Sequence, residues 1–184
     1  MPNPIVQLHT GEAVTLATLA NGQPHAIVFL RHLGCIFCRE HVGMLRDVPA
    51  SQLTFVAMAT PAEAERFRAE LKVPQAIICD PGKTLYAEFG LGEGTLGQLF
   101  SFETFRRGIR ASMAGYRSGR PNADPRVLGG SFVVNAEGDV VWSRPSLNAA
   151  DNATAAEILA ALSAAQDSTA PHAGTASTSA TARL

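Results

Sequence analysis

The chain lacks an excess of either charge and lacks any long apolar run, and both absences exclude classes of function. Its 184 residues carry 15 basic and 16 acidic side chains, which gives a formal net charge of −1. A nucleic-acid-binding protein normally presents a basic face, so this balance argues against a nucleic-acid partner. The apolar stretches, such as Ala26 to Leu30, are far shorter than the roughly 20 residues that span a bilayer, so we expect no membrane segment.

Cysteine is also scarce, and the first residues carry no secretory pattern. Met1 to Pro4 has no positive region and no apolar run behind it, from which we expect a cytoplasmic protein. The three cysteines are an odd number that does not suit a structural disulfide framework. Two of them, Cys35 and Cys38, form a Cys-x-x-Cys pair, which in such a protein indicates a redox pair or half of a metal site.

The sequence does contain enough apolar residues, 46% of the total, to build one hydrophobic core. Apolar runs at residues 26–30, 53–59 and 76–79 predict strands buried on both faces, and the stretches between them predict helices. This alternation implies parallel strands joined by helical crossovers, and a hairpin at 131–134 and 140–142 adds an antiparallel edge. The sequence therefore predicts an α/β fold with a central mixed sheet and helices on both faces.

The chain is expected to form a single domain over residues 1–166. Thr154, with Glu157 three residues later, predicts the start of the last helix, which runs to about Gln166. Residues 167–184 are rich in Ala, Ser, Thr and Gly and have almost nothing to bury, so we expect a disordered tail. An earlier helix, from Thr95 to about Met113, has a broad apolar face that we expect to pack on the sheet. Alternatively, this apolar face could line a pocket for an apolar substrate or form a homodimer interface.

The Cys-x-x-Cys pair follows a predicted buried strand and a turn at Gly34, and it opens a helix. A cysteine at a helix N-terminus faces unpaired backbone N–H groups and the positive end of the helix dipole, and both favour the thiolate. Arg31 and His32 are expected to add positive charge, which lowers a thiol pKa from its usual ~8.5. Cys38 lies one helical turn further on, close enough to form a disulfide once Cys35 has reacted. We therefore predict a dithiol redox site in which Cys35 reacts first.

Two other interpretations of these residues stay open: two core cysteines that happen to line one helix, and a metal site. His32, Cys35, Cys38 and His41 are three residues apart, and such a run of four zinc-type ligands offers a structural zinc site. Zinc sites usually draw two ligands from each of two separated elements, so four at one helix start would be crowded, and we expect neither a metal nor another cofactor. Cys79 ends the third predicted strand, and we expect it to be a buried small side chain.

The stretch Phe29 to His41, which contains Arg-x-x-Gly-Cys-x-x-Cys-Arg-Glu, resembles the active-site segment of a known family. This family is the peroxiredoxin-like proteins of the alkyl hydroperoxide reductase/thiol-specific antioxidant group, in the thioredoxin superfamily. Residues 80–91 and 129–138 resemble two later segments of the same family. The resemblance implies a thioredoxin-like fold and an antioxidant thiol peroxidase, with a hydroperoxide or disulfide substrate and a thiol reductant such as thioredoxin or glutathione.

One departure from the family pattern concerns the residue that orients the peroxide. Typical members carry a threonine three residues before the peroxidatic cysteine. If Cys35 is peroxidatic, that position is His32; if Cys38 is peroxidatic, Cys35 takes the place of the threonine. We favour Cys35 because of its place at the helix end.

A second departure concerns a cation. The arginine that the family places before the late strand aligns with Gly129, so it is absent here or is replaced by Arg31 or Arg126. The predicted site consists of Cys35, Cys38, Arg31 and His32, and its reaction cycle forms an intramolecular disulfide between the two cysteines. The alternative function is a redox-sensing or disulfide-exchange domain with little peroxidase turnover.

Overall fold

The computed structural model describes residues 4–94 and 102–169. In chain order the elements are β1 (Ile5–Leu8), β2 (Ala13–Thr15), α1 (Leu16–Ala20), β3 (His25–Phe29), α2 (Ile36–Met44), β4 (Leu53–Ala57), α3 (Pro61–Leu71), β5 (Ala76–Cys79), α4 (Thr84–Glu88), α6 (Phe102–Met113), β6 (Gly130–Val134), β7 (Val140–Pro145) and α7 (Ala155–Thr169). Within these residues, no helix has the length and apolar character needed to cross a membrane.

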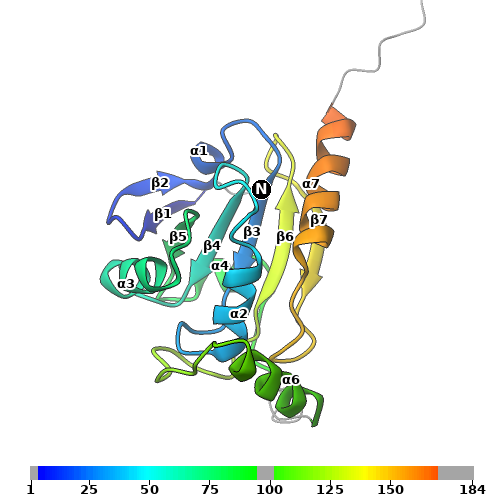
Figure 1. The fold of residues 1–184 in the computed structure, drawn as a ribbon. Helices are drawn as coiled ribbons and strands as arrows, with labels where there is room; N and C mark the ends of the chain where they lie inside the picture. Colours follow the sequence, from blue (N-terminus) through cyan, green and yellow to red (C-terminus); the bar gives the residue numbers. More distant parts are fainter. Residues whose placement is uncertain (1–3, 95–101, 170–184) are drawn as a thin grey trace, which may run out of the picture.

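The strands form one mixed sheet in the order β2-β1-β5-β4-β3-β6-β7 (Figure 1). The three predicted central strands, β3, β4 and β5, pair in parallel, and the β6–β7 hairpin adds the expected antiparallel edge. The sequence did not predict β1 and β2, which extend the other edge through antiparallel pairing of β1 with β5. These strands are only four and three residues long, so they carry too little periodicity to be recognised.

Helices cover both faces of this sheet, as predicted for an α/β fold. Successive residues of β3 point to opposite faces, so Ala26 and Val28 join one cluster of buried side chains while Ile27 and Phe29 join another. The first cluster includes residues of α2, α3 and α7, and the second includes residues of α4. Because both faces are covered, every residue of β3 and β4 is buried, which explains their continuous apolar runs.

Helix ends mostly follow the local signals in the sequence. The predicted cap of α3 is confirmed: Thr60 and Glu63 form a reciprocal capping box, and Pro61 is the first helical residue. The side chains of Thr154 and Glu157 make the same exchange before α7. This last helix continues to Thr169, three residues past the predicted end, and residues 170–184 of the predicted tail lie outside the described residues.

The prediction for the helix at 95–113 is only partly confirmed. Its second part is α6, whereas residues 95–101 lie outside the described residues. Ile109 and Met113, which we expected to pack on the sheet, are 48% and 84% exposed, so that expectation is wrong. The helix instead lies against the N-terminal part of α2, where Gly108 faces the ring of Phe37 (Figure 1).

Candidate active site

The dithiol lies where β3 ends and α2 begins. Cys35 is the N-cap residue of α2, with extended backbone at φ −73° and ψ 124°, and its N–H donates to the carbonyl oxygen of His32 at 3.0 Å. Cys38 belongs to the first turn of the helix. Both are free thiols, and they are 6% and 4% exposed. The predicted strand–turn–helix arrangement of the pair is therefore confirmed.

A distant segment, residues 115–128, packs over this turn, and we call it the cover loop. Its Gly119 N–H donates to the carbonyl oxygen of Gly34 at 2.9 Å. The side chain of Asn122 accepts from the N–H of Leu33 at 2.9 Å and donates to the carbonyl oxygen of Met58 at 3.1 Å. A Cβ atom on Gly34 would lie 2.3 Å from the carbonyl oxygen of Arg120, so this close approach requires glycine.

The buried guanidinium group of Arg31 connects the cover loop to the sulfur atoms. Its Nη1 donates to Cys35 Sγ at 3.4 Å, while Nε donates to the carbonyl oxygen of Val127 at 3.4 Å and Nη2 to that of Pro125. The backbone N–H of Arg31 donates to Cys38 Sγ at 3.3 Å. Apart from Cys35, the partners of this guanidinium among the described residues are neutral carbonyl groups, so its charge is available to a thiolate.

The structure also decides between the two alternatives for the cation near the dithiol. A Cβ atom on Gly129 would lie 2.3 Å from the carbonyl oxygen of Phe29, so a residue with a side chain does not fit at position 129. Arg126 lies outside the site, paired with Asp124 at 2.8 Å and with Glu93 at 3.2 Å. The guanidinium group that contacts Cys35 is that of Arg31, which comes from the end of β3.

The two sulfur atoms have opposite acid–base character. The pKa of Cys35 is lowered to about 6, first by a hydrogen bond from the Cys38 thiol and then, against the effect of burial, by the charge of Arg31 and by the N–H groups of Cys38 and Phe37. The pKa of Cys38 is raised well above its usual value by the same hydrogen bond, by burial and by the charge on Cys35. At neutral pH Cys35 is therefore mostly a thiolate, and Cys38 keeps its proton.

His32 is buried beside this pair but is not a cation. Burial and the positive charge of Arg31 lower its pKa to about 4, so the prediction that His32 adds positive charge is wrong. Its Nδ1 is buried and has no hydrogen-bond partner among the described residues. A neutral imidazole with an unused ring nitrogen is therefore present three residues before Cys35.

The hypothesis of a structural zinc site finds no support in the geometry. Within residues 4–94 and 102–169 there is no group of three His, Cys, Asp or Glu side chains that could hold a metal ion. His41, the fourth ligand of the predicted run, bonds through Nε2 to the carbonyl oxygen of Ala153 at 2.8 Å. It therefore ties α2 to the segment before α7.

Two further residues complete the description of the sulfur environment. Cys79 is buried at the end of β5, as predicted, and burial and the charge of Glu63 raise its pKa to about 11. Tyr86 on α4, which the sequence analysis did not single out, is 1% exposed and donates its hydroxyl hydrogen to the carbonyl oxygen of Leu30. A buried tyrosine needs such a partner. Tyr86 lies within residues 80–91, which resemble a segment of the family, but the sequence does not indicate which carbonyl group its hydroxyl contacts.

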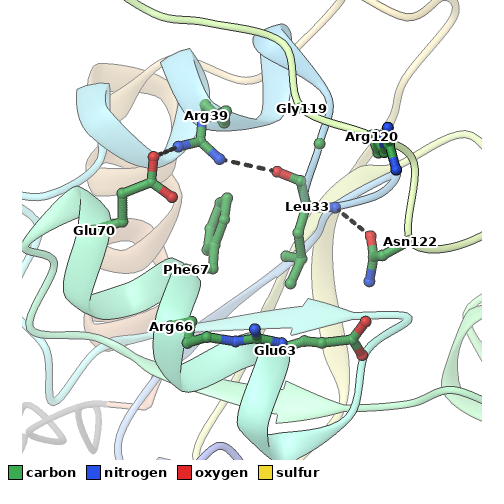
Figure 2. A pocket seen from close by; sticks show the side chains of 10 residues that line it. Leu33, Arg39, Glu63, Arg66, Phe67, Glu70, Gly119, Arg120 and Asn122 are labelled. Carbon is green, nitrogen blue, oxygen red and sulfur yellow. Dashed lines mark hydrogen bonds and ion pairs between the residues drawn. The ribbon is translucent and has the colours of Figure 1, made fainter.

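An open pocket of about 290 Å³ lies beside the dithiol turn, between α2, α3 and the cover loop (Figure 2). Figure 2 shows Arg39 extended across the ring of Phe67, with its guanidinium group donating to the carbonyl oxygen of Leu33 and paired with Glu70. Gly34, the residue before Cys35, also lines the pocket. The pocket therefore reaches the backbone of the turn that precedes the dithiol.

The comparisons with known proteins agree with this fold. The sequence model of a family described as AhpC/TSA antioxidant enzyme matches residues 44–146, more than half of the chain. The matched segment begins at the end of α2, so the dithiol lies just before it. No curated protein matches the chain.

Several solved structures share the arrangement of the elements. Peroxidoxin BcpB from Mycobacterium tuberculosis is 18% identical, with 89% of this chain and 94% of that chain covered and a TM-score of 0.62. The Xanthomonas campestris bacterioferritin comigratory protein is 15% identical, with 91% and 97% covered and a TM-score of 0.57. A putative protein disulfide isomerase from Bacteroides thetaiotaomicron is 16% identical, with 89% and 83% covered and a TM-score of 0.54. These likenesses confirm the predicted thioredoxin-like fold.

Proposed function

The chain belongs to the AhpC/TSA antioxidant enzyme family, and from this premise we propose that it is a thiol peroxidase that acts through Cys35 and Cys38. The observation that carries the proposal is the asymmetry of the pair. Cys35 accepts hydrogen bonds from Arg31 and Cys38 and has a pKa of about 6, whereas Cys38 stays protonated beside it. One sulfur is thus prepared to attack and the other to close the disulfide.

In the first step the Cys35 thiolate attacks the terminal oxygen of a hydroperoxide. A sulfur–oxygen bond forms and the O–O bond breaks. The leaving group is an alkoxide, which takes up a proton to become an alcohol, or, from hydrogen peroxide, hydroxide, which becomes water. Negative charge moves from sulfur to oxygen in this step, and the fixed guanidinium group of Arg31 is positioned to stabilise it. Neutral His32 replaces the hydroxyl group of the family threonine as the hydrogen-bonding partner of the peroxide.

In the second step Cys38 loses its proton and its sulfur attacks the sulfenic acid of Cys35. The disulfide forms as hydroxide leaves and is protonated to water. An external thiol then attacks Cys35, and a second thiol completes the reduction. We propose that the protein is cytoplasmic and that thioredoxin or glutathione is this reductant, because the cytoplasm supplies both.

Disulfide exchange is the second candidate function, because the two cysteines share one helix start and a solved structure named as a putative disulfide isomerase has the same fold. The Cys35 thiolate would then attack a substrate disulfide, with Cys38 resolving the mixed disulfide. This function uses the same two sulfurs and differs in the electrophile.

A steady-state assay tests the proposal and separates the two candidates. The purified protein is supplied with hydrogen peroxide or an organic hydroperoxide and with a thioredoxin or glutathione system coupled to NADPH oxidation. We expect NADPH oxidation that depends on both the protein and the peroxide. Reduction of a disulfide substrate without any peroxide-dependent turnover would contradict the peroxidase and support disulfide exchange.

A further inference from the structure

A continuous chain of hydrogen bonds joins Tyr86 to the dithiol from the opposite side of the sheet. The phenol hydroxyl donates to the carbonyl oxygen of Leu30 and lies 3.2 Å from that of Val56. Leu30 is the last residue before Arg31, so its carbonyl group and the Arg31 N–H belong to one peptide group. That N–H donates to Cys38 Sγ at 3.3 Å. The Cys38 thiol in turn donates to Cys35.

Through these hydrogen bonds, the hydroxyl group of Tyr86 affects a sulfur atom that it does not contact. A donor on the carbonyl oxygen of a peptide group polarises its N–H, and consecutive hydrogen bonds strengthen one another in a buried environment. Tyr86, Leu30 and Cys38 are 1%, 1% and 4% exposed, so water does not compete for these groups. The polarised N–H favours negative charge on Cys38 Sγ.

We propose that Tyr86 is a positioning residue for the resolving thiol, holding the Leu30–Arg31 peptide group so that its N–H stabilises the Cys38 thiolate. This role rests on the proposed dithiol cycle and concerns its later steps. When an external thiolate bonds to Cys35 Sγ, the S–S bond breaks and its electron pair leaves on Cys38 Sγ. When the disulfide closes, Cys38 gives up its proton before its sulfur bonds to Cys35. In both steps negative charge resides on Cys38, next to this N–H.

The surroundings of Tyr86 keep it a donor and fix its place. Burial raises the pKa of Tyr86 well above its usual value, and the charges of Cys38 and Asp80 act in the same direction. The Asp80 carboxylate accepts the N–H groups of Thr84 and Leu85, each at 2.9 Å, which anchors the first turn of α4. The hydroxyl proton is therefore present, and held in one place, at every pH at which the dithiol operates.

The test measures how fast the Cys35–Cys38 disulfide opens. The disulfide is formed with diamide, and its opening by excess dithiothreitol is followed at several pH values in the wild type and in Tyr86→Phe. We expect opening to slow by about three- to tenfold in Tyr86→Phe, because one hydrogen bond that supports the leaving thiolate is lost. The matched control is Tyr116→Phe, which removes the only other tyrosine hydroxyl, at a site packed against Gly43, and should open at the wild-type rate.

A second measurement separates the hydrogen bond from packing and does not require the Tyr86→Phe variant to fold. In Tyr116→Phe, 3-fluorotyrosine incorporation labels position 86 alone. The more acidic phenol is a stronger donor, so opening should become faster, in the opposite direction to Tyr86→Phe. Wild-type opening rates in Tyr86→Phe, or no acceleration with 3-fluorotyrosine, would overturn the proposal.

This test is independent of peroxidase activity, because diamide forms the disulfide without peroxide. A wild-type protein that forms the disulfide but never consumes hydroperoxide would refute the proposed function and leave the role of Tyr86 measurable. If peroxide consumption is normal but neither Tyr86→Phe nor 3-fluorotyrosine at position 86 changes the rate of disulfide opening, only the role of Tyr86 is refuted.

Discussion

Hydroperoxide consumption is expected to fall by at least about 10³-fold when Cys35 is replaced by serine. The serine hydroxyl group does not ionise near neutral pH, so the contacts with Arg31 and Cys38 no longer produce a nucleophile. Serine is close to cysteine in size, and the N-cap position of α2 accepts it readily, so the fold should be retained. The measurement is the peroxide-dependent rate in the NADPH-coupled assay, with circular dichroism to check the fold.

Cys79→Ser is the matched control for this loss. Cys79 lies at the end of β5, burial and Glu63 raise its pKa to about 11, and it contributes to no step of the proposed cycle. We expect this variant to keep the wild-type rate. Peroxide turnover in Cys35→Ser, or its loss in Cys79→Ser alone, would show that the attacking sulfur has been misassigned.

The second large effect is expected for Arg31→Met, which should lower the rate of peroxide consumption at pH 7 by about 10²-fold. Methionine keeps much of the aliphatic stem but removes the charge beside Cys35 and the donors to Val127 and Pro125. The pKa of Cys35 should rise, so the pH at which the rate is half-maximal moves to a higher value and part of the rate returns in alkaline solution. A stability loss of about 2 kcal/mol should accompany this change, because the buried carbonyl group of Val127 and the part-buried one of Pro125 lose their donor.

The pH profile distinguishes a charge effect from a folding effect in this variant. Arg126→Met removes a guanidinium group from the exposed ion pairs with Asp124 and Glu93, and it should leave the profile unchanged. An Arg31→Met enzyme that loses rate equally at all pH values would contradict the electrostatic role of Arg31.

The features predicted from the sequence are those that depend on neighbouring residues. The continuous apolar runs of β3 and β4 reveal strands covered on both faces, and the Thr60–Glu63 capping box determines where α3 begins. The position of Cys35 at a helix start likewise follows from the strand and glycine turn before it. In each case the local signal agrees with the tertiary structure.

The features that the sequence leaves open depend on contacts between distant segments. The choice between Arg31 and Arg126 depends on which guanidinium group reaches Cys35: Arg31 donates to its sulfur, whereas Arg126 pairs with Asp124 and Glu93. The loss of charge on His32 follows from its burial, and the partner of Tyr86 lies 56 residues away in the chain. The apolar residues of α6 satisfied a helical pattern, yet that pattern does not say which surface the helix covers.

The most direct test of the dithiol mechanism is a single turnover of the reduced protein with one equivalent of hydrogen peroxide. Stopped-flow kinetics would follow the loss of the thiolate, and mass spectrometry of the digested protein would identify the product. The mechanism predicts a rate that rises with pH through about 6, the pKa of Cys35, and a disulfide between Cys35 and Cys38 with Cys79 unmodified. A disulfide that includes Cys79, or oxidation of neither Cys35 nor Cys38, would contradict it.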